Sequence, residues 1–303
     1  MRILVANDDG IEAPGLHALA AAARRTTDDI IVVAPLEDWS GASAAVGAFY
    51  RRDGVAYRTF DLDGLEGVAA YGIDGPPALG VILACVGGFG PRPDVVLSGI
   101  NHGVNVGRAA LHSGTVGAVL TGAQFGLRGL ATSLRYGPDP VPWRTAAELA
   151  EALLPTVCSS PPATVLNLNV PDVAPEGLQG VRQARLGRGG TIQAVHFEER
   201  PSGEQETLAA QGNSADGRES EPFSSPPPGP EGTLYLDLAV PGSARRDAPV
   251  GSDPMDVDAL LIGADFATVT ALVGVREATD AQHTVAEAVV AAEHVVSSRR
   301  ATR

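Results

Sequence analysis

The fold of this chain is indicated first by residues 1–25, which read MRILVANDDGIEAPGLHALAAAARR. Arg2–Ala6 is a short apolar run, as expected of a strand that is buried on both faces of a sheet. After an acidic turn, Pro14 opens a helical pattern that runs to about Arg25, and proline suits the first turn of a helix. A strand, a polar turn and a helix in this order predict the first unit of a parallel α/β sheet.

The same alternation continues over about the first 170 residues. Strands are predicted at Ile30–Ala34, Asp94–Leu97, Leu130–Leu134 and Val165–Val170, and helices at Pro77–Val86, Gly114–Phe125 and Trp143–Leu154. Strands that alternate with helices predict an α/β fold, in which a mostly parallel sheet is covered by helices on both faces.

The later part of the chain has a different composition. Residues 187–232 are rich in Gly, Ser, Pro and Glu, and they predict a long loop or arm. Strands are predicted at Thr233–Val240 and Ala259–Val273, and an amphipathic terminal helix at 280–298. We therefore expect a catalytic core over 1–186, and over 187–303 a β-rich extension that packs on the core and takes part in oligomer contacts.

Charge and composition exclude several classes of function. The net charge of −14 disfavours a nucleic-acid polymer as partner, although a small phosphate ester bound through a metal ion stays compatible with it. The chain has no lysine, so a lysine Schiff base and a Walker-type lysine are excluded. Neither a run of about 18 apolar residues nor a signal-peptide pattern occurs, so we expect a cytoplasmic protein without a membrane span.

Polar segments follow several predicted strands. The first is Asn7-Asp8-Asp9-Gly10, where two adjacent carboxylates repel each other and lose hydration. A hard divalent cation removes both problems, and ligands of open α/β sheets bind at the carboxyl ends of the strands. The alternative is a turn with helix-capping acids.

Three further segments lie on the same predicted rim. Ser40 in the loop 39–43 offers a hydroxyl oxygen, and the glycine-rich segment 98–107 offers Asn101 and Asn105 as neutral oxygens and amide donors. Ser113-Gly114-Thr115 begins a helix, where free N–H groups bind anions. A polar loop, a plain turn and an ordinary helix cap are the respective alternatives. Together the segments predict a site for a hard metal ion and a phosphate.

These motifs resemble those of the SurE family, the stationary-phase survival proteins that act as 5′/3′-nucleotidases. The matching segments are residues 1–15, 40–43, 98–107, 113–118 and 167–171. The resemblance is ordered over about the first 170 residues and weak beyond them. It implies a Rossmann-like core, a C-terminal portion used in homodimer or homotetramer contacts, and small phosphate esters, mainly nucleoside monophosphates, as substrates.

The resemblance also implies roles for individual residues. One divalent metal ion, Mg²⁺ or Mn²⁺, would be held by Asp8, Asp9, Ser40 and Asn101. The phosphate would be held by Asn105, Ser113, Gly114 and Thr115.

Several positions depart from the family pattern. Leu36-Glu37 stands where the family usually has Asp-Arg, Gly75-Pro76-Pro77 replaces Gly-Thr-Pro, and Thr121 replaces a glutamate. The segment 202–230 looks like an insertion. The departures favour a specialised substrate, such as a modified nucleotide or a sugar phosphate.

The predicted chemistry is metal-assisted displacement at phosphorus. Asp8 or Asp9 would orient or deprotonate the attacking water, and a nucleophilic aspartate is the alternative. His102 and His112 flank the site and are candidates to protonate the leaving alcohol, with local hydrogen bonding as the alternative role. Another metal-dependent hydrolase and a non-catalytic binding protein of the same fold are the competing functions.

Overall fold

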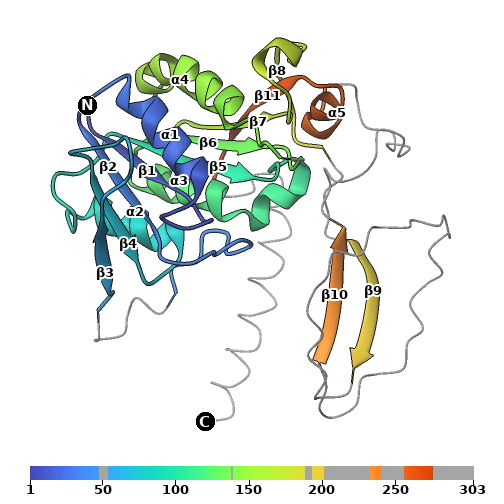
Figure 1. The fold of residues 1–303 in the computed structure, drawn as a ribbon, viewed down its shortest axis with the longest axis horizontal. Coiled ribbons are helices and arrows are strands. Elements are labelled where there is room, and N and C mark those ends of the chain that lie inside the picture. The colour runs from blue at the N-terminus through green and yellow to red at the C-terminus, as the bar shows by residue number, and fades with distance from the viewer. Residues whose placement is uncertain (48–53, 138, 188–192, 201–232, 240–255, 276–303) are drawn as a thin grey trace, which may run out of the picture.

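The structure is a computed structural model, and it describes residues 1–47, 54–137, 139–187, 193–200, 233–239 and 256–275. Within this part of the chain, nine strands form one sheet in the order β3-β4-β2-β1-β5-β6-β7-β11-β8 (Figure 1). These strands are β1 (Ile3–Ala6), β2 (Ile30–Pro35), β3 (Tyr57–Phe60), β4 (Ala69–Ile73), β5 (Val95–His102), β6 (Arg128–Leu134), β7 (Val165–Val170), β8 (Val181–Gln183) and β11 (Ala267–Leu272). The strands from β4 to β7 in this order are parallel, whereas β3 and β11 pair antiparallel with β4 and β7.

Helices cover both faces of the sheet. They are α1 (Pro14–Arg24), α2 (Pro77–Cys85), α3 (Gly114–Gln124), α4 (Trp143–Ser159) and α5 (Asp258–Gly263), with short 3₁₀ helices η1 (Gly107–His112) and η2 (Pro175–Gly177). Alternate β1 residues separate the two cores: Ile3 and Val5 pack with α1 and α4, whereas Leu4 and Ala6 pack with α2 and α3. The predicted α/β fold with a mostly parallel, doubly covered sheet is confirmed.

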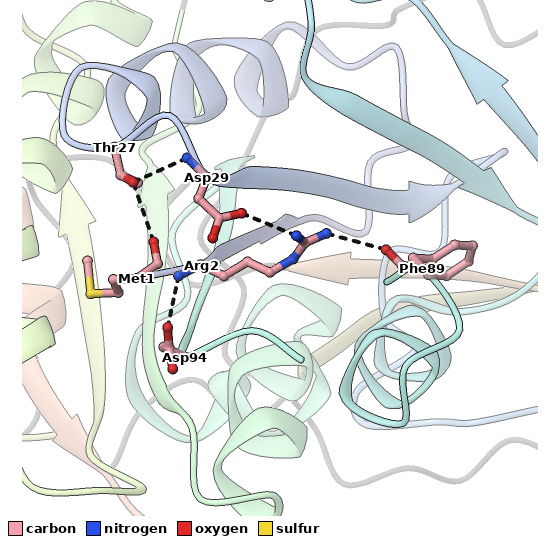
Figure 2. A network of polar contacts seen from close by, with 6 residues as sticks. All are labelled: Met1, Arg2, Thr27, Asp29, Phe89 and Asp94. Atoms are coloured by element: carbon pink, nitrogen blue, oxygen red, sulfur yellow. Dashed lines mark hydrogen bonds and ion pairs between the residues drawn. The ribbon is translucent and has the colours of Figure 1, made fainter. Parts of the chain in front are cut away.

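Polar contacts join the starts of three central strands at the end of the sheet opposite the predicted site (Figure 2). The Arg2 backbone N–H donates to Asp94 Oδ2 at 2.8 Å, and its guanidinium donates to Asp29 Oδ1 at 3.2 Å and to the Phe89 carbonyl at 3.3 Å. Thr27 Oγ1 donates to the Met1 carbonyl at 3.4 Å. The network holds β1, β2 and β5 in register at their first residues, so their carboxyl ends form a common rim.

Two predictions for the later part of the chain are wrong. Residues 258–263 form helix α5, not a strand. A short apolar run is compatible with either a strand or a helix, and packing against the rest of the fold determines which one forms. Residues 193–200, predicted as loop, form β9 (Gln193–Arg200), which pairs antiparallel with β10 (Thr233–Ala239) as a separate two-stranded sheet (Figure 1). The terminal helix predicted at 280–298 lies outside the described residues.

The division at residue 186 stays a prediction. β11, which lies beyond that boundary, is hydrogen-bonded between β7 and β8, so the later part of the chain contributes a strand to the main sheet. Among the described residues, no helix is both long enough and apolar enough to cross a bilayer.

Candidate active site

The acidic turn between β1 and α1 is held from within and from β2. Asn7 is fully buried, and its Nδ2 donates to the Gly10 carbonyl at 2.8 Å. The Ile11 N–H donates to the carbonyl of Pro35, the last residue of β2, at 2.8 Å. These bonds fix the backbone around Asp8 and Asp9, so the Asn7 side chain stabilises the conformation of the turn.

Asp8 lies directly against the beginning of α3. Its side chain is 2% exposed, and its Oδ1 accepts a hydrogen bond from Thr115 Oγ1 at 2.5 Å. A Cβ placed on Gly114 would lie 2.6 Å from Asp8 Oδ2, so only glycine fits there. The predicted metal ligand and the predicted phosphate-binding residues are therefore in contact.

The two carboxylates of the turn are electrostatically costly without a cation. Burial raises the pKa of Asp8. Burial, together with the charges of Asp8 and Asp38, raises the pKa of Asp9 to about 7. Both shifts follow because a charged carboxylate loses hydration and faces a like charge. Asp38 is a third acid of this site, and sequence reasoning missed it although it lies two residues before Ser40.

The loop that carries Ser40 is bound to η1 and to Asp8. The Trp39 N–H donates to the Asp8 carbonyl at 2.8 Å, and Ser43 Oγ donates to the Leu111 carbonyl at 2.7 Å. Ser40 Oγ donates to Asp38 Oδ1 at 2.6 Å. Ser40 is therefore brought beside the acidic turn, with its hydroxyl held by Asp38.

An extra residue in β5 decides which way Asn101 faces. Ser98 pairs with Ala131, and the next pair is Asn101 with Ser133. Between these two pairs β5 advances three residues and β6 only two, so β5 contains a β-bulge. An extra residue turns the following side chains to the other face of the sheet. Ile100 accordingly packs in the α1/α4 core, and Asn101 pairs with Ser133 on the α3 side, which is the side of Asp8.

Asn105 is held by a network of amide side chains. Its N–H donates to Asn169 Oδ1 at 2.7 Å, and its carbonyl accepts from Asn167 Nδ2 at 2.8 Å and from Asn169 Nδ2 at 3.2 Å. Its own Nδ2 donates to Ser133 Oγ at 2.8 Å. The fully buried pair Asn167 and Asn169 thus positions the backbone of a predicted phosphate-binding residue, a role that sequence reasoning missed.

The first turn of α3 has the features of an anion site. Ser113 is 7% exposed and caps the helix, because its Oγ accepts from the Val116 N–H at 3.1 Å. Gly114 and Thr115 are the first residues of the helix, where backbone N–H groups lack intrahelical partners and the helix dipole is positive. Thr121, one of the departures, donates to the Gly117 carbonyl at 2.7 Å inside the helix.

The donor set fits a hard divalent cation. It combines the carboxylates of Asp8 and Asp9 with the hydroxyl of Ser40 and the amide oxygen of Asn101, whose Nδ2 donates to the Gly103 carbonyl at 2.6 Å. Oxygen ligands of this kind suit Mg²⁺ and Mn²⁺. A bound cation would stabilise the charged carboxylates and so offset the cost of burying them, which raises their pKa values. Among the described residues, no group of three or more His, Cys, Asp or Glu side chains is arranged to hold a metal ion.

The two histidines occupy different surroundings. The His102 ring stacks on the Tyr136 ring, with the two centroids 4.3 Å apart. It also meets the Trp143 ring in an edge-to-face arrangement, with the centroids 5.3 Å apart. Burial lowers the pKa of His102, which works against a role as proton donor. His112 is exposed, and its carbonyl accepts from the Ser43 N–H at 3.2 Å, beside Ser113. The proposed acid roles of both residues stay predictions.

The chain is similar in sequence and in fold to known proteins. The family model described as "Survival protein SurE" matches residues 3–192. A protein named 5′-nucleotidase SurE from Chloroflexus aggregans is 41% identical over 192 residues, covering 62% of this chain and 73% of that protein. One of the same name from Methylococcus capsulatus is 40% identical over 205 residues, covering 67% and 77%. The crystal structure of the SurE protein from Aquifex aeolicus has the same fold, with a TM-score of 0.66, 22% identity and coverage of 94% and 98%.

Proposed function

This chain belongs to the SurE family of survival proteins, and from that premise we propose that it is a metal-dependent phosphomonoesterase acting on a nucleoside monophosphate or a related nucleotide or sugar phosphate. The enzyme class is that of the relatives named 5′-nucleotidase, the phosphoric monoester hydrolases.

One contact carries the proposal. Thr115, at the helix end expected to bind the phosphate, donates its hydroxyl to Asp8, the buried carboxylate expected to bind the metal. The two expected sites therefore share a boundary, as a mechanism needs in which the cation and the phosphoryl group touch.

The residues then have the following roles. A bound divalent ion supplies charge that polarises the phosphoryl group and lowers the pKa of water. Asp8, Asp9, Ser40 and Asn101 would hold the ion. Asp9, the more exposed of the two carboxylates, orients the attacking water and accepts its proton.

The phosphate is held at the start of α3, next to Asp8. The N–H group of Gly114, with the side chains of Asn105 and Ser113, stabilises the charge that develops on the transferring group, while Thr115 holds Asp8 beside it through its N–H and its hydroxyl. His112 is the better placed of the two histidines to protonate the leaving alcohol, because it is exposed and adjoins Ser113.

Release of inorganic phosphate from a panel of phosphomonoesters tests the proposal. The protein is stripped with a chelator and assayed with and without Mg²⁺ or Mn²⁺. Asp8→Asn and Asp9→Asn are each expected to lower kcat/KM by roughly a hundred-fold or more. Asp61→Asn, at an exposed position outside the site, is the matched control. Undiminished activity in both site variants, or full activity without a metal ion, would contradict the proposal.

The oligomeric state belongs to the same proposal. We expect a homodimer or homotetramer, as the family resemblance implies. The solution mass from light scattering, measured over a range of protein concentrations, tests it, and a monomer at all concentrations would overturn it.

A further inference from the structure

A cavity lies beside the loop that carries Ser40, an expected metal ligand. It has a volume of about 300 Å³ and lies among the carboxyl ends of β2 and β4 and the edge strand β3. Figure 1 shows β3 and β4 at one edge of the sheet. The side chains that give this cavity its chemistry are Glu37, Trp39, Tyr57, Arg58 and Asp74. None of them belongs to the ligand set expected for the metal or the phosphate.

The cavity is joined to the expected metal site through one loop. Trp39 lines the cavity, while its N–H donates to the Asp8 carbonyl at 2.8 Å and its chain neighbour Ser40 is an expected metal ligand. A phosphate ester bound at the metal would therefore have its leaving group close to this opening. The cavity is thus placed to receive the leaving group of the proposed phosphatase reaction.

Part of the cavity wall comes from a segment that departs from the family pattern. Glu37 belongs to the pair that replaces Asp-Arg, and Asp74 directly precedes the altered Gly75-Pro76-Pro77. The Leu36 N–H donates to the Ile73 carbonyl at 2.8 Å, which joins the two segments side by side. Two of the altered positions, Leu36 and Glu37, therefore line the cavity, and a lining residue, Asp74, adjoins another altered segment.

The lining indicates the chemistry of the group that fits. Trp39 and Tyr57 are 37% and 59% exposed, and such aromatic surfaces stack on planar rings. Glu37 and Asp74 accept hydrogen bonds, as acidic side chains do from the amino group of cytosine. With Arg58, the three charged side chains sum to a formal charge of −1, which disfavours a second phosphate in the cavity. The volume lies at the low end of the ~300–1,000 Å³ of ligand pockets, which suits one base.

We propose that this cavity binds the nucleobase of the substrate and selects bases that carry an exocyclic amino group. Adenine, guanine and cytosine meet that condition, whereas hypoxanthine and uracil do not. The inference rests on the proposed function, because it assigns the leaving group of that reaction to a nucleoside.

A binding experiment tests the cavity without catalysis. The chain has two tryptophans, Trp39 and Trp143, so Trp143→Phe leaves Trp39 as the single reporter. Adenosine, cytidine, inosine and uridine, which carry no phosphate, are titrated in the presence of a chelator. Adenosine and cytidine are expected to quench Trp39 fluorescence saturably, with inosine and uridine binding roughly ten-fold more weakly. Trp39→Phe, which keeps Trp143, is expected to show no saturable change.

A kinetic experiment tests selection by the two acids. Full-length protein with Mn²⁺ is expected to prefer AMP to IMP in kcat/KM by roughly ten- to a hundred-fold, the range for one hydrogen bond to a charged group. Asp74→Asn and Glu37→Gln are each tested, and at least one is expected to abolish the preference, because an amide also donates to the hypoxanthine oxygen. Ribose 5-phosphate, which has no base, is expected to be hydrolysed at the same rate by the wild-type protein and by all variants. The control variant Asp61→Asn is expected to match the wild-type protein on every substrate.

The outcomes separate the inference from the proposed function. Unchanged Trp39 fluorescence, or an AMP preference that survives both substitutions, overturns the inference while phosphate release still supports the phosphatase. If wild-type protein hydrolyses no phosphomonoester, the proposed function fails, and the inference about its leaving group falls with it.

Discussion

Asp258 Oδ2 accepts a hydrogen bond of 2.8 Å from the backbone N–H of Gly107, across 151 residues of sequence. Asp258 is fully buried, and its other oxygen accepts from the N–H groups of Gly187 at 3.0 Å and Ala259 at 2.8 Å. A carboxylate from α5 thereby holds the start of η1, two residues after Asn105. The later part of the chain thus supports the segment that we expect to bind the phosphate.

We expect Asp258→Asn to weaken that support. An amide supplies one acceptor oxygen where the carboxylate supplies two, and a buried N–H left without a partner costs about 1–3 kcal/mol. Thermal denaturation is expected to show a lower Tm, and steady-state kinetics a higher KM. Asp256→Asn is the control, because Asp256 pairs with Arg185 at the surface. Equal losses of Tm in the two variants would contradict the role assigned to Asp258.

The metal-free protein should lose stability as the pH rises. The pKa of Asp9 is raised to about 7 in the folded state, above its value in the unfolded chain. A raised carboxyl pKa contributes stability that is complete below the unfolded pKa and is lost as the pH rises through the folded one. In chelator, the Tm is therefore expected to be higher near pH 5 than near pH 8. Asp9→Asn should flatten this dependence.

Added Mg²⁺ or Mn²⁺ should act in the opposite direction. The ion binds the deprotonated carboxylates, so its stabilising effect grows with pH. The increase in Tm on adding metal is expected to be larger at pH 8 than at pH 5, and small in Asp8→Asn at both. A Tm that does not respond to either ion at pH 8 would argue against the metal site.

A single methyl group at Gly114 should disable the site. The added Cβ would lie 2.6 Å from Asp8 Oδ2 and 2.7 Å from Asp8 Cβ, so Asp8 or α3 must shift. Gly114→Ala is expected to lower kcat/KM by roughly a hundred-fold, because small displacements of reacting groups have effects of that size. Gly263→Ala is the control, since an added Cβ there meets no atom within 4 Å. Normal activity of Gly114→Ala would show that Asp8 need not hold this position.

The hydroxyl of Thr115 should affect both stability and metal affinity through its hydrogen bond to Asp8. Thr115→Val keeps the shape of the side chain and removes the donor to the buried Oδ1. We expect a loss of stability of about 1–3 kcal/mol in chelator and a weaker affinity for Mn²⁺ measured by calorimetry. Thr145→Val, which removes a bond to the Val173 carbonyl on the other side of the sheet, should lower stability without changing Mn²⁺ affinity.

The predicted elements that were confirmed are those with strong local signals. β1 and β2 are apolar runs that are buried throughout, and α1 begins at a proline. The edge strand β3 was not predicted, because Tyr57–Phe60 is mostly exposed and shows no alternation. α4 runs past the predicted end at Leu154, since Val157 is buried in the core beyond Pro155.

The sequence by itself determined the parallel α/β sheet and the polar motifs on its rim, because strand burial, helix starts and turn residues are local properties of the chain. The acidic turn was recognisable in this way. Tertiary structure alone decided that Asp8 touches Thr115, that an extra residue in β5 places Asn101 on the α3 face of the sheet, and that Asp258 reaches Gly107. These relations join residues 107 and 151 positions apart, or depend on how one strand is aligned with its neighbour. No local pattern encodes such distances, because they arise when the helices and strands pack together.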